Sequence, residues 1–165
     1  MAETPERLVE RLNGDGFKTL EFFGRLSPGQ MECSVYTDGS CWKVRQILAH
    51  FVSTEKAFSL LIKDVLAGGS GAPEEFEIER FNENEVAGLG LLPFQDLLVE
   101  FETLRSGNVQ IVQGMTLTDL SRMGRHPFLG MTTLEEIVKL LYRHNQIHQR
   151  DMRKALQSPS GENYE

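Results

Sequence analysis

The chain has 165 residues, 40% hydrophobic and 25% charged, which is the composition of an ordinary soluble globular protein and enough for one compact domain. Its formal net charge is −7 and its 17 lysine and arginine residues are scattered, so a phosphate backbone would be repelled and nucleic-acid binding is not expected. The charged N-terminus lacks the apolar run of a signal peptide and no stretch approaches the roughly 20 apolar residues of a membrane span, which predicts a cytoplasmic protein that does not enter membranes.

The first predicted helix spans residues 5–26. Thr4 suits the N-cap, and Pro5 suits the first helical position, where its missing N–H leaves no hydrogen bond unmade. Leucine and phenylalanine side chains recur along this segment and supply one apolar face: Leu8, Leu12, Phe17, Leu20 and Phe23. The turn-forming sequence SPGQ at 27–30 ends the helix.

Residues 27–41 carry turn-forming glycine, serine, proline and aspartate, which predicts a loop. This loop holds the only two cysteines, Cys33 and Cys41. Their spacing is not that of a CxxC redox or zinc motif, so reduced thiols are expected and nothing supports a disulfide between them.

The second predicted helix spans residues 42–66, where apolar side chains recur at three- and four-residue intervals.

A long connection with an acidic run follows at residues 68–92. Loops of more than about 12–15 residues without structure of their own are uncommon in compact domains, so a packed loop with room for a short helical turn is expected. The third predicted helix spans residues 93–113. After a turn and a loop at 118–131, Thr133 and Glu136 form a capping-box pattern at the start of a fourth helix that reaches about residue 156.

Four helices of about 20 residues are each about 30 Å long, and no convincing alternating strand pattern accompanies them. The natural way to bury four such apolar stripes is a bundle. The predicted fold is therefore all-α: a single-domain antiparallel four-helix bundle over residues 1–157, with a frayed tail at 158–165.

The fourth helix places two histidines, His144 and His148, where its inward stripe should continue with apolar residues. They lie one turn apart, so their rings project side by side. His50 lies at the edge of the apolar face of the second helix. Three histidines from two facing helices can converge on one divalent cation, and the alternative is a hydrogen-bonded structural cluster. His126 precedes a proline in a turn and is not counted as a ligand.

Three segments carry a resemblance to a known family: WKVRQILAHFVSTEKAF at 42–58, RFNENEV at 80–86, and GRHPFLGMTTLEEIVKLLYRHNQIHQRDMRKAL at 124–156. Together they cover most of the chain, and they resemble the DinB-like (DinB/YfiT-like) superfamily of metal-dependent enzymes. The resemblance implies a four-helix bundle, often a homodimer. It also implies one divalent metal ion, held here by His50, His144 and His148.

Three neutral ligands leave a divalent ion with its full charge and at least one open position, where a bound water or thiol is acidified or a carbonyl is polarised. Imidazole suits zinc, nickel or iron, so the residues do not identify the metal. The resemblance extends to thiol-dependent S-transferases and to maleylpyruvate isomerases, but the isomerases carry a further C-terminal domain for which this chain has no room. The expected function is a thiol-dependent S-transferase that joins a low-molecular-weight thiol to a small-molecule substrate. The alternatives are a metal-dependent hydrolase and a non-catalytic metal- or ligand-binding protein.

A general base for a hydrolase does not stand out. Glu55 follows His50 by five residues and is expected to be a surface carboxylate, and nothing fixes Glu83 or Glu85 near the metal. This favours thiol chemistry, because the metal alone can deprotonate a coordinated thiol. Asn82 is the candidate substrate-binding residue, with capping of its own loop as the alternative. Polar residues beside the two ligands of the fourth helix are candidate hydrogen-bond partners of their rings: Asn145, Gln146 and Gln149.

Overall fold

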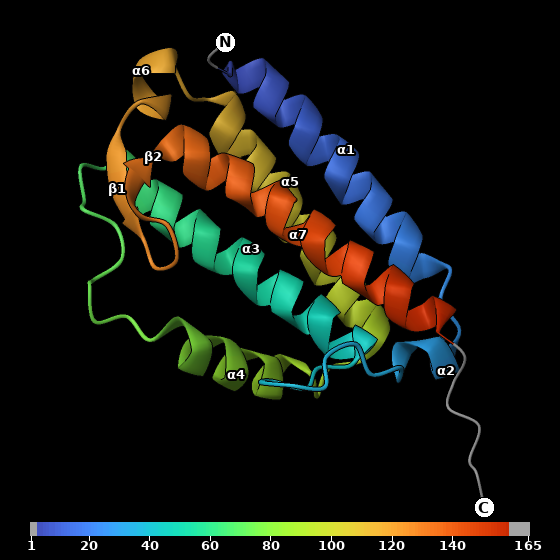
Figure 1. Cartoon of the computed structure of the whole chain (residues 1–165). Helices are drawn as coiled ribbons and strands as arrows, with labels where there is room; N and C mark the ends of the chain where they lie inside the picture. The colour runs from blue at the N-terminus through green and yellow to red at the C-terminus, as the bar shows by residue number, and fades with distance from the viewer. Residues whose placement is uncertain (1–2, 159–165) are drawn as a thin grey trace, which may run out of the picture.

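The computed structural model describes residues 3–158, and four long helices form its bundle (Figure 1). They are α1 (Pro5–Gly24), α3 (Val44–Leu66), α5 (Phe94–Gln113) and α7 (Leu134–Gln157). The side chain of the N-cap residue accepts a hydrogen bond from a backbone N–H of the first turn in α1 and in α7. The predicted four-helix bundle is confirmed, and the helix ends agree closely with those expected from the apolar periodicity.

The four long helices form a closed ring of contacts, in which α1 and α3 each pack against α5 and α7. As Figure 1 shows, α1 and α7 run in one direction and α3 and α5 in the other. Because α3 and α5 are consecutive and parallel, the chain between them has to return along the bundle. It does so through α4 (Ile78–Leu89), which packs against α3.

The predicted packed loop at 68–92 therefore contains a 12-residue helix, more than the short turn expected there. Its one fully buried residue is Val86, and its N-cap, Glu77, makes no side-chain capping bond. The helix is amphipathic, but the acidic side chains between its apolar positions conceal that spacing in the sequence. Its packing on α3 supplies the stability that a short isolated helix lacks.

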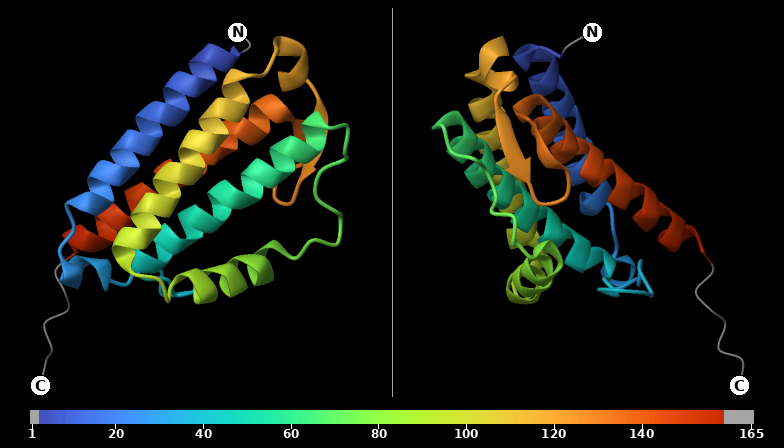
Figure 2. Two further views of the ribbon diagram at one scale, coloured as in Figure 1. Left: turned by 180° about the vertical axis from the view of Figure 1, so that it is seen from behind. Right: turned by 60° about the vertical axis from the view of Figure 1, so that its left-hand side comes forward.

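A two-stranded antiparallel hairpin precedes α7, in the segment where a turn and a loop were expected, and the all-α class still holds. Strand β1 (Met123–His126) pairs with β2 (Gly130–Thr133), and the turn between them uses the positive φ of Gly130. Strands of four residues are too short for an alternating pattern to stand out. The hairpin lies beside the end of α3 and the start of α7 (Figure 2).

Short helices and caps complete the connections. Helices α2 (Pro28–Met31) and α6 (Leu117–Leu120) are each a single turn closed by a capping box. At the start of α7, Thr133 accepts a hydrogen bond from the backbone N–H of Glu136, as predicted. The carboxylate of Glu136 binds Lys139 and makes no bond back to the cap, so the predicted box is only half formed.

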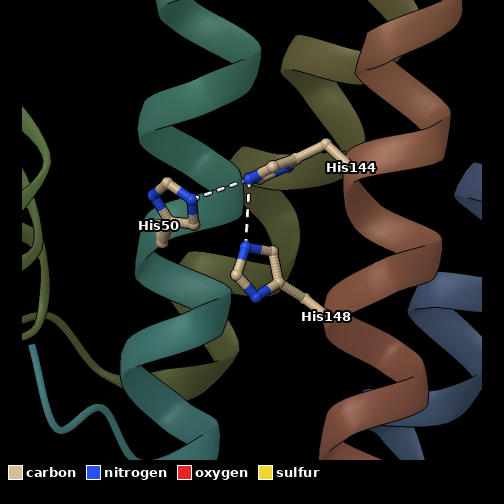
Figure 3. A group of neighbouring side chains, drawn as sticks. All are labelled: His50, His144 and His148. Atoms are coloured by element: carbon tan, nitrogen blue, oxygen red, sulfur yellow. Dashed lines mark hydrogen bonds between the residues drawn. The ribbon is translucent and has the colours of Figure 1, made fainter. Parts of the chain in front are cut away.

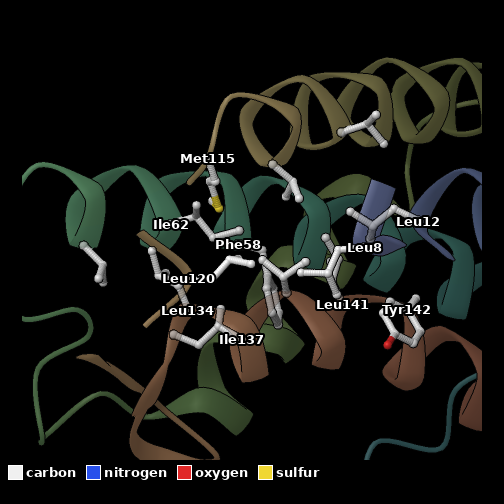
Figure 4. Close-up of a cluster of buried hydrophobic side chains, with 14 residues drawn as sticks. Leu8, Leu12, Phe58, Ile62, Met115, Leu120, Leu134, Ile137, Leu141 and Tyr142 are labelled. Atoms are coloured by element: carbon white, nitrogen blue, oxygen red, sulfur yellow. The ribbon is translucent and has the colours of Figure 1, made fainter. Parts of the chain in front are cut away.

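The core consists of two apolar clusters. The first lies toward the hairpin end of the bundle and is drawn in Figure 4; it is built from all four long helices and includes Leu8, Phe58, Ile62, Val112, Leu134 and Leu141. The second lies toward the other end and includes Phe23, Ile47, Phe51, Leu97, Phe101 and Met152. A group of polar side chains also lies buried inside the same bundle.

Arg105 of α5 is the centre of this polar group and is 4% exposed. It donates to Glu55 Oε1 through Nε (2.9 Å) and Nη2 (2.6 Å), and to Asp15 Oδ2 through Nη1 (3.0 Å). Asn108 donates to the other Glu55 oxygen at 2.8 Å. The expectation of a surface carboxylate at position 55 was wrong, because α3 is buried on all sides over residues 47–55. Every charge in the group has a partner, which buried charges require.

No helix in the described part of the chain combines the length and the apolar character needed to cross a lipid bilayer. The predicted frayed tail at 158–165 lies outside the described residues apart from Ser158.

Candidate metal site

Three histidine rings from α3 and α7 meet between these helices (Figure 3). The Nε2 atom of His144 lies 2.8 Å from Nε2 of His50 and 3.1 Å from Nε2 of His148, and the three atoms lie within 4.8 Å of one another. With metal–nitrogen bonds of about 2.1 Å, two imidazole ligands at a right angle place their nitrogens about 3.0 Å apart. The spacing of the rings therefore suits a shared cation.

The protons on these rings can be assigned from their hydrogen bonds. The hydroxyl of Tyr36 lies 2.7 Å from Nδ1 of His148 and donates its proton to Asp151 Oδ2 at 2.9 Å. Because that proton is used, the tyrosine oxygen accepts from Nδ1–H of His148. Nε2 of His148 is then left with a free lone pair, which is the form that binds a metal.

His144 has the same arrangement. Its Nδ1 lies 3.3 Å from Oδ1 of Asn145, an acceptor, so the proton again belongs on Nδ1 and the lone pair on Nε2. Asn145 in turn donates to Asp15 at 3.4 Å, which links the ring to the buried ion pairs. Of the other two candidate partners, Gln149 donates to Thr19 Oγ1 at 2.7 Å and Gln146 is exposed.

Burial keeps the three rings neutral. It lowers the pKa of His144 to about 3, with the neighbouring His148 adding to the effect, and it lowers the pKa of His148 to about 4 although Asp151 opposes the shift. The pKa of His50 is lowered well below its usual value by burial and then by the other two histidines. At neutral pH the rings are therefore uncharged, and a cation meets no positive charge on them. The donor set fits a divalent transition metal.

The position of the histidines on α7 differs from the prediction. The fully buried positions are Asn145 and Gln149, whereas His144 and His148 are half-buried and face α3. Trp42 packs against the buried ring of His50, with ring centroids 4.7 Å apart. The pair therefore stands at the edge of the core, where one side of each ring remains accessible.

A cavity of about 610 Å³ opens beside the three histidines. Its walls come from α3, α4, α7, the hairpin and the segment between α3 and α4. Most of the surface is apolar, and the side chains responsible include Phe58, Leu61, Phe76, Phe81, Phe128 and Ile147. Among the described lining residues the one carboxylate is Asp64, which accepts a hydrogen bond from the backbone N–H of Gly71 at 3.0 Å. A large apolar pocket with a few polar groups is typical of a small-molecule site.

Asn82, the candidate substrate-binding residue, lies on α4 and lines this cavity, while Glu83 and Glu85 do not line it. Glu55 is held in its ion pair with Arg105, so it is not a base available to the site.

Two residues of the site carried no signal in the sequence. Tyr36 belongs to the loop before α3, and its role depends on a contact with Asp151, more than a hundred residues away.

The cysteines of that same loop are both free thiols. The thiol of Cys33 lies near the carbonyl oxygen of Ala155, Cys41 is exposed, and neither joins the histidine cluster.

Comparison with known proteins places the chain in a family. It matches no curated protein sequence. Its fold is similar to that of YfiT from Bacillus subtilis, with a TM-score of 0.76 and 16% identity over 92% of this chain and 85% of that one. YfiT is described as a probable metal-dependent hydrolase with an unusual four-helix bundle topology. The sequence profile of the DinB superfamily matches residues 16–152, and the chain belongs to the DinB superfamily.

Proposed function

We propose that the protein binds one divalent transition-metal ion through His50, His144 and His148 and uses it as a metal-dependent enzyme, in the first place a thiol-dependent S-transferase. The observation that carries the proposal is the meeting of three Nε2 atoms at the side of a large apolar cavity. Catalytic sites of this type use three protein ligands and keep a position open, whereas structural sites are usually closed by four. A divalent ion held there supplies an acidified thiol or water and a polarised carbonyl.

The residues around the cluster each have a part in this proposal. Tyr36 and Asp151 hold the ring of His148 in the tautomer and orientation that binding requires. Asn145 does the same for His144. The apolar walls exclude water and hold the body of the substrate, which strengthens electrostatic interactions at the reacting end.

The distribution of carboxylates favours a thiol as the nucleophile. Glu55 is locked in an ion pair with Arg105, and Asp64 accepts a backbone hydrogen bond. A hydrolase generally uses a base to remove a proton from water, whereas a coordinated thiol loses its proton to solvent through the effect of the metal alone.

A metal-dependent hydrolase is the second candidate. It is supported by the similarity to YfiT, whose description names that activity. The same cluster and cavity would serve it, with water in place of the thiol.

Elemental analysis of the purified protein tests the metal. We expect about one transition-metal ion per chain in the wild type and little in His148→Ala. His126→Asn is the matched control, because it removes a histidine outside the cluster and should keep its metal. Equal metal contents in wild type and His148→Ala would refute the ligand assignment.

Activity assays on the same preparations separate the two enzyme classes. Conjugation of monochlorobimane with cysteine or glutathione reports S-transfer, and release of p-nitrophenol from its acetate or butyrate ester without thiol reports hydrolysis. We expect metal-dependent conjugation that is lost in His148→Ala. Ester cleavage that is lost in that variant, without conjugation, would establish the hydrolase in place of the transferase.

A further inference from the structure

His126 occupies a place in the cavity that the metal proposal does not use. It belongs to β1, is 5% exposed and lines the same cavity as the three clustered histidines. Its Nδ1 accepts hydrogen bonds from the backbone N–H groups of Phe128 (3.0 Å) and Leu129 (3.3 Å). A ring nitrogen that accepts hydrogen bonds carries no proton, so the proton of this neutral ring is on Nε2.

The Nε2–H group of His126 is a donor without a protein acceptor. No described residue accepts a hydrogen bond from it. The Nε2 atom is also absent from the set of fully buried polar atoms without a partner, so it keeps some contact with open space. The ring itself is fixed: its other nitrogen is held by the turn, and one face packs against Phe58 with centroids 5.2 Å apart. Because this ring is already fixed, little side-chain entropy is lost when a ligand atom accepts a hydrogen bond from it. A fixed donor at the wall of an apolar cavity therefore suits recognition of a ligand.

The spacing of the lining residues along α3 bears on the length of such a ligand. Phe58, which contacts His126, follows His50 by eight residues on α3, a rise of about 12 Å. Thr54 lies between them on the same face and also lines the cavity. The cavity therefore runs along α3, with the histidine cluster at one end and the free donor toward the other.

The lining also sets the charge of the ligand. No lysine or arginine is present among the described lining residues, and Asp64 contributes a carboxylate at the end away from the cluster. With a formal net charge of −7 on the whole chain, an anionic group would find no counter-charge away from the histidine cluster and its proposed metal ion. The apolar surface and its few neutral polar groups, His126 and Asn82 among them, suit an uncharged molecule with a hydrogen-bond acceptor.

We infer that the cavity takes an elongated, uncharged, largely apolar molecule with a carbonyl-type oxygen at one end, and that Nε2–H of His126 binds this oxygen and directs the other end to the histidine cluster. The direction toward the cluster rests on the proposed function, but binding in the cavity does not depend on metal. His126 is thus a specificity-determining residue, distinct from the candidate metal ligands.

Two naphthalene probes of similar shape test this inference on the metal-free protein. 2-Acetylnaphthalene carries a carbonyl oxygen, and 2-isopropylnaphthalene replaces it with a methyl group. Trp42 is the only tryptophan of the chain and lines the cavity, so quenching of its fluorescence reports binding of either probe.

The informative variant is His126→Asn. The shorter side chain can still accept the backbone N–H two residues on, as asparagine does in turns, but its amide does not reach the place of Nε2. We expect its affinity for the ketone to fall about threefold to tenfold, the value of one net neutral hydrogen bond, and its affinity for the hydrocarbon to stay unchanged. His126→Gln, whose amide N–H reaches further, should recover the preference for the ketone.

Equal losses of both probes in His126→Asn would mean that the residue only maintains the shape of the cavity, and unchanged affinities would mean that its donor is not used. Either result overturns the inference. Elemental analysis of the same protein keeps the two proposals apart. A ketone preference in a protein that binds no metal would refute the proposed function alone, and metal binding without a ketone preference would refute this inference alone.

Discussion

The hydroxyl of Tyr36 joins His148 to Asp151, and its removal tests whether the cluster is a metal site. In Tyr36→Phe the ring keeps its edge contact with His148, at a centroid distance of 5.8 Å, so packing is largely preserved. The variant loses the acceptor of the Nδ1–H bond and the donor to the carboxylate. Loss of such a partner typically weakens metal binding by 10- to 100-fold, roughly.

The lower end of that range is expected here. The side chain of Asp151 is 27% exposed, so water can reach it and replace part of the lost contact. We therefore expect about a tenfold weaker affinity, or about 1.4 kcal/mol. Competition with a chromophoric zinc chelator near neutral pH measures it. Tyr142→Phe is the control. Tyr142 lies on α7, as His148 and Asp151 do, but it packs in the first apolar cluster. A Tyr36→Phe affinity equal to that of wild type would refute the reasoning.

Three further predictions concern stability. Arg105→Met leaves two buried carboxylates without their cation and should lower the free energy of unfolding by about 3–5 kcal/mol in urea titrations, and a loss below about 1 kcal/mol would contradict the ion-pair assignment. The metal-free protein should lose stability as the pH falls below about 6.5. Burial lowers the pKa of His126 to about 4 and that of His144 to about 3 in the folded chain. The unfolded chain therefore takes up protons that the folded chain does not, which favours unfolding. His126→Asn should make that decline shallower in urea titrations at successive pH values. Gly71→Ala should lower the melting temperature more than Gly68→Ala; both positions have positive φ, but only at Gly71 does an added Cβ come within 2.5 Å of the β1 backbone.

The long helices could be predicted from the sequence because their signals are local. Apolar spacing and turn residues set the spans, and Thr4 and Thr133 cap α1 and α7 as expected. Helix α4 and the hairpin could not be recovered in the same way. The first owes its stability to packing on α3, and each strand of the second is four residues long.

The site was predictable where it depended on histidines, whose chemistry is conspicuous at any position. The sequence brought His50, His144 and His148 together as candidates, and the structure places their Nε2 atoms side by side. It missed Tyr36, because a tyrosine in a loop carries no sign of a contact more than a hundred residues away. It also assigned Glu55 to the surface. Helical spacing indicates which residues share a face of the helix, but not how deeply that face is buried.

The ion pairs around Arg105 have a consequence for how the helices are aligned along their axes. This one side chain holds α5 to α1 and α3 at once, through Asp15 and Glu55. Sliding any of these helices by one turn, about 5.4 Å, would carry a carboxylate away from its cation into hydrocarbon surroundings, a far larger penalty than a shifted leucine incurs. Apolar contacts alone tolerate several offsets, whereas this arrangement permits one. The helix that carries His50 is therefore held at one offset from α1 and α5, and Asn145 ties the helix of His144 and His148 to the same charged group by donating to Asp15. This group of charges thus helps to set the height at which each helix presents its imidazoles.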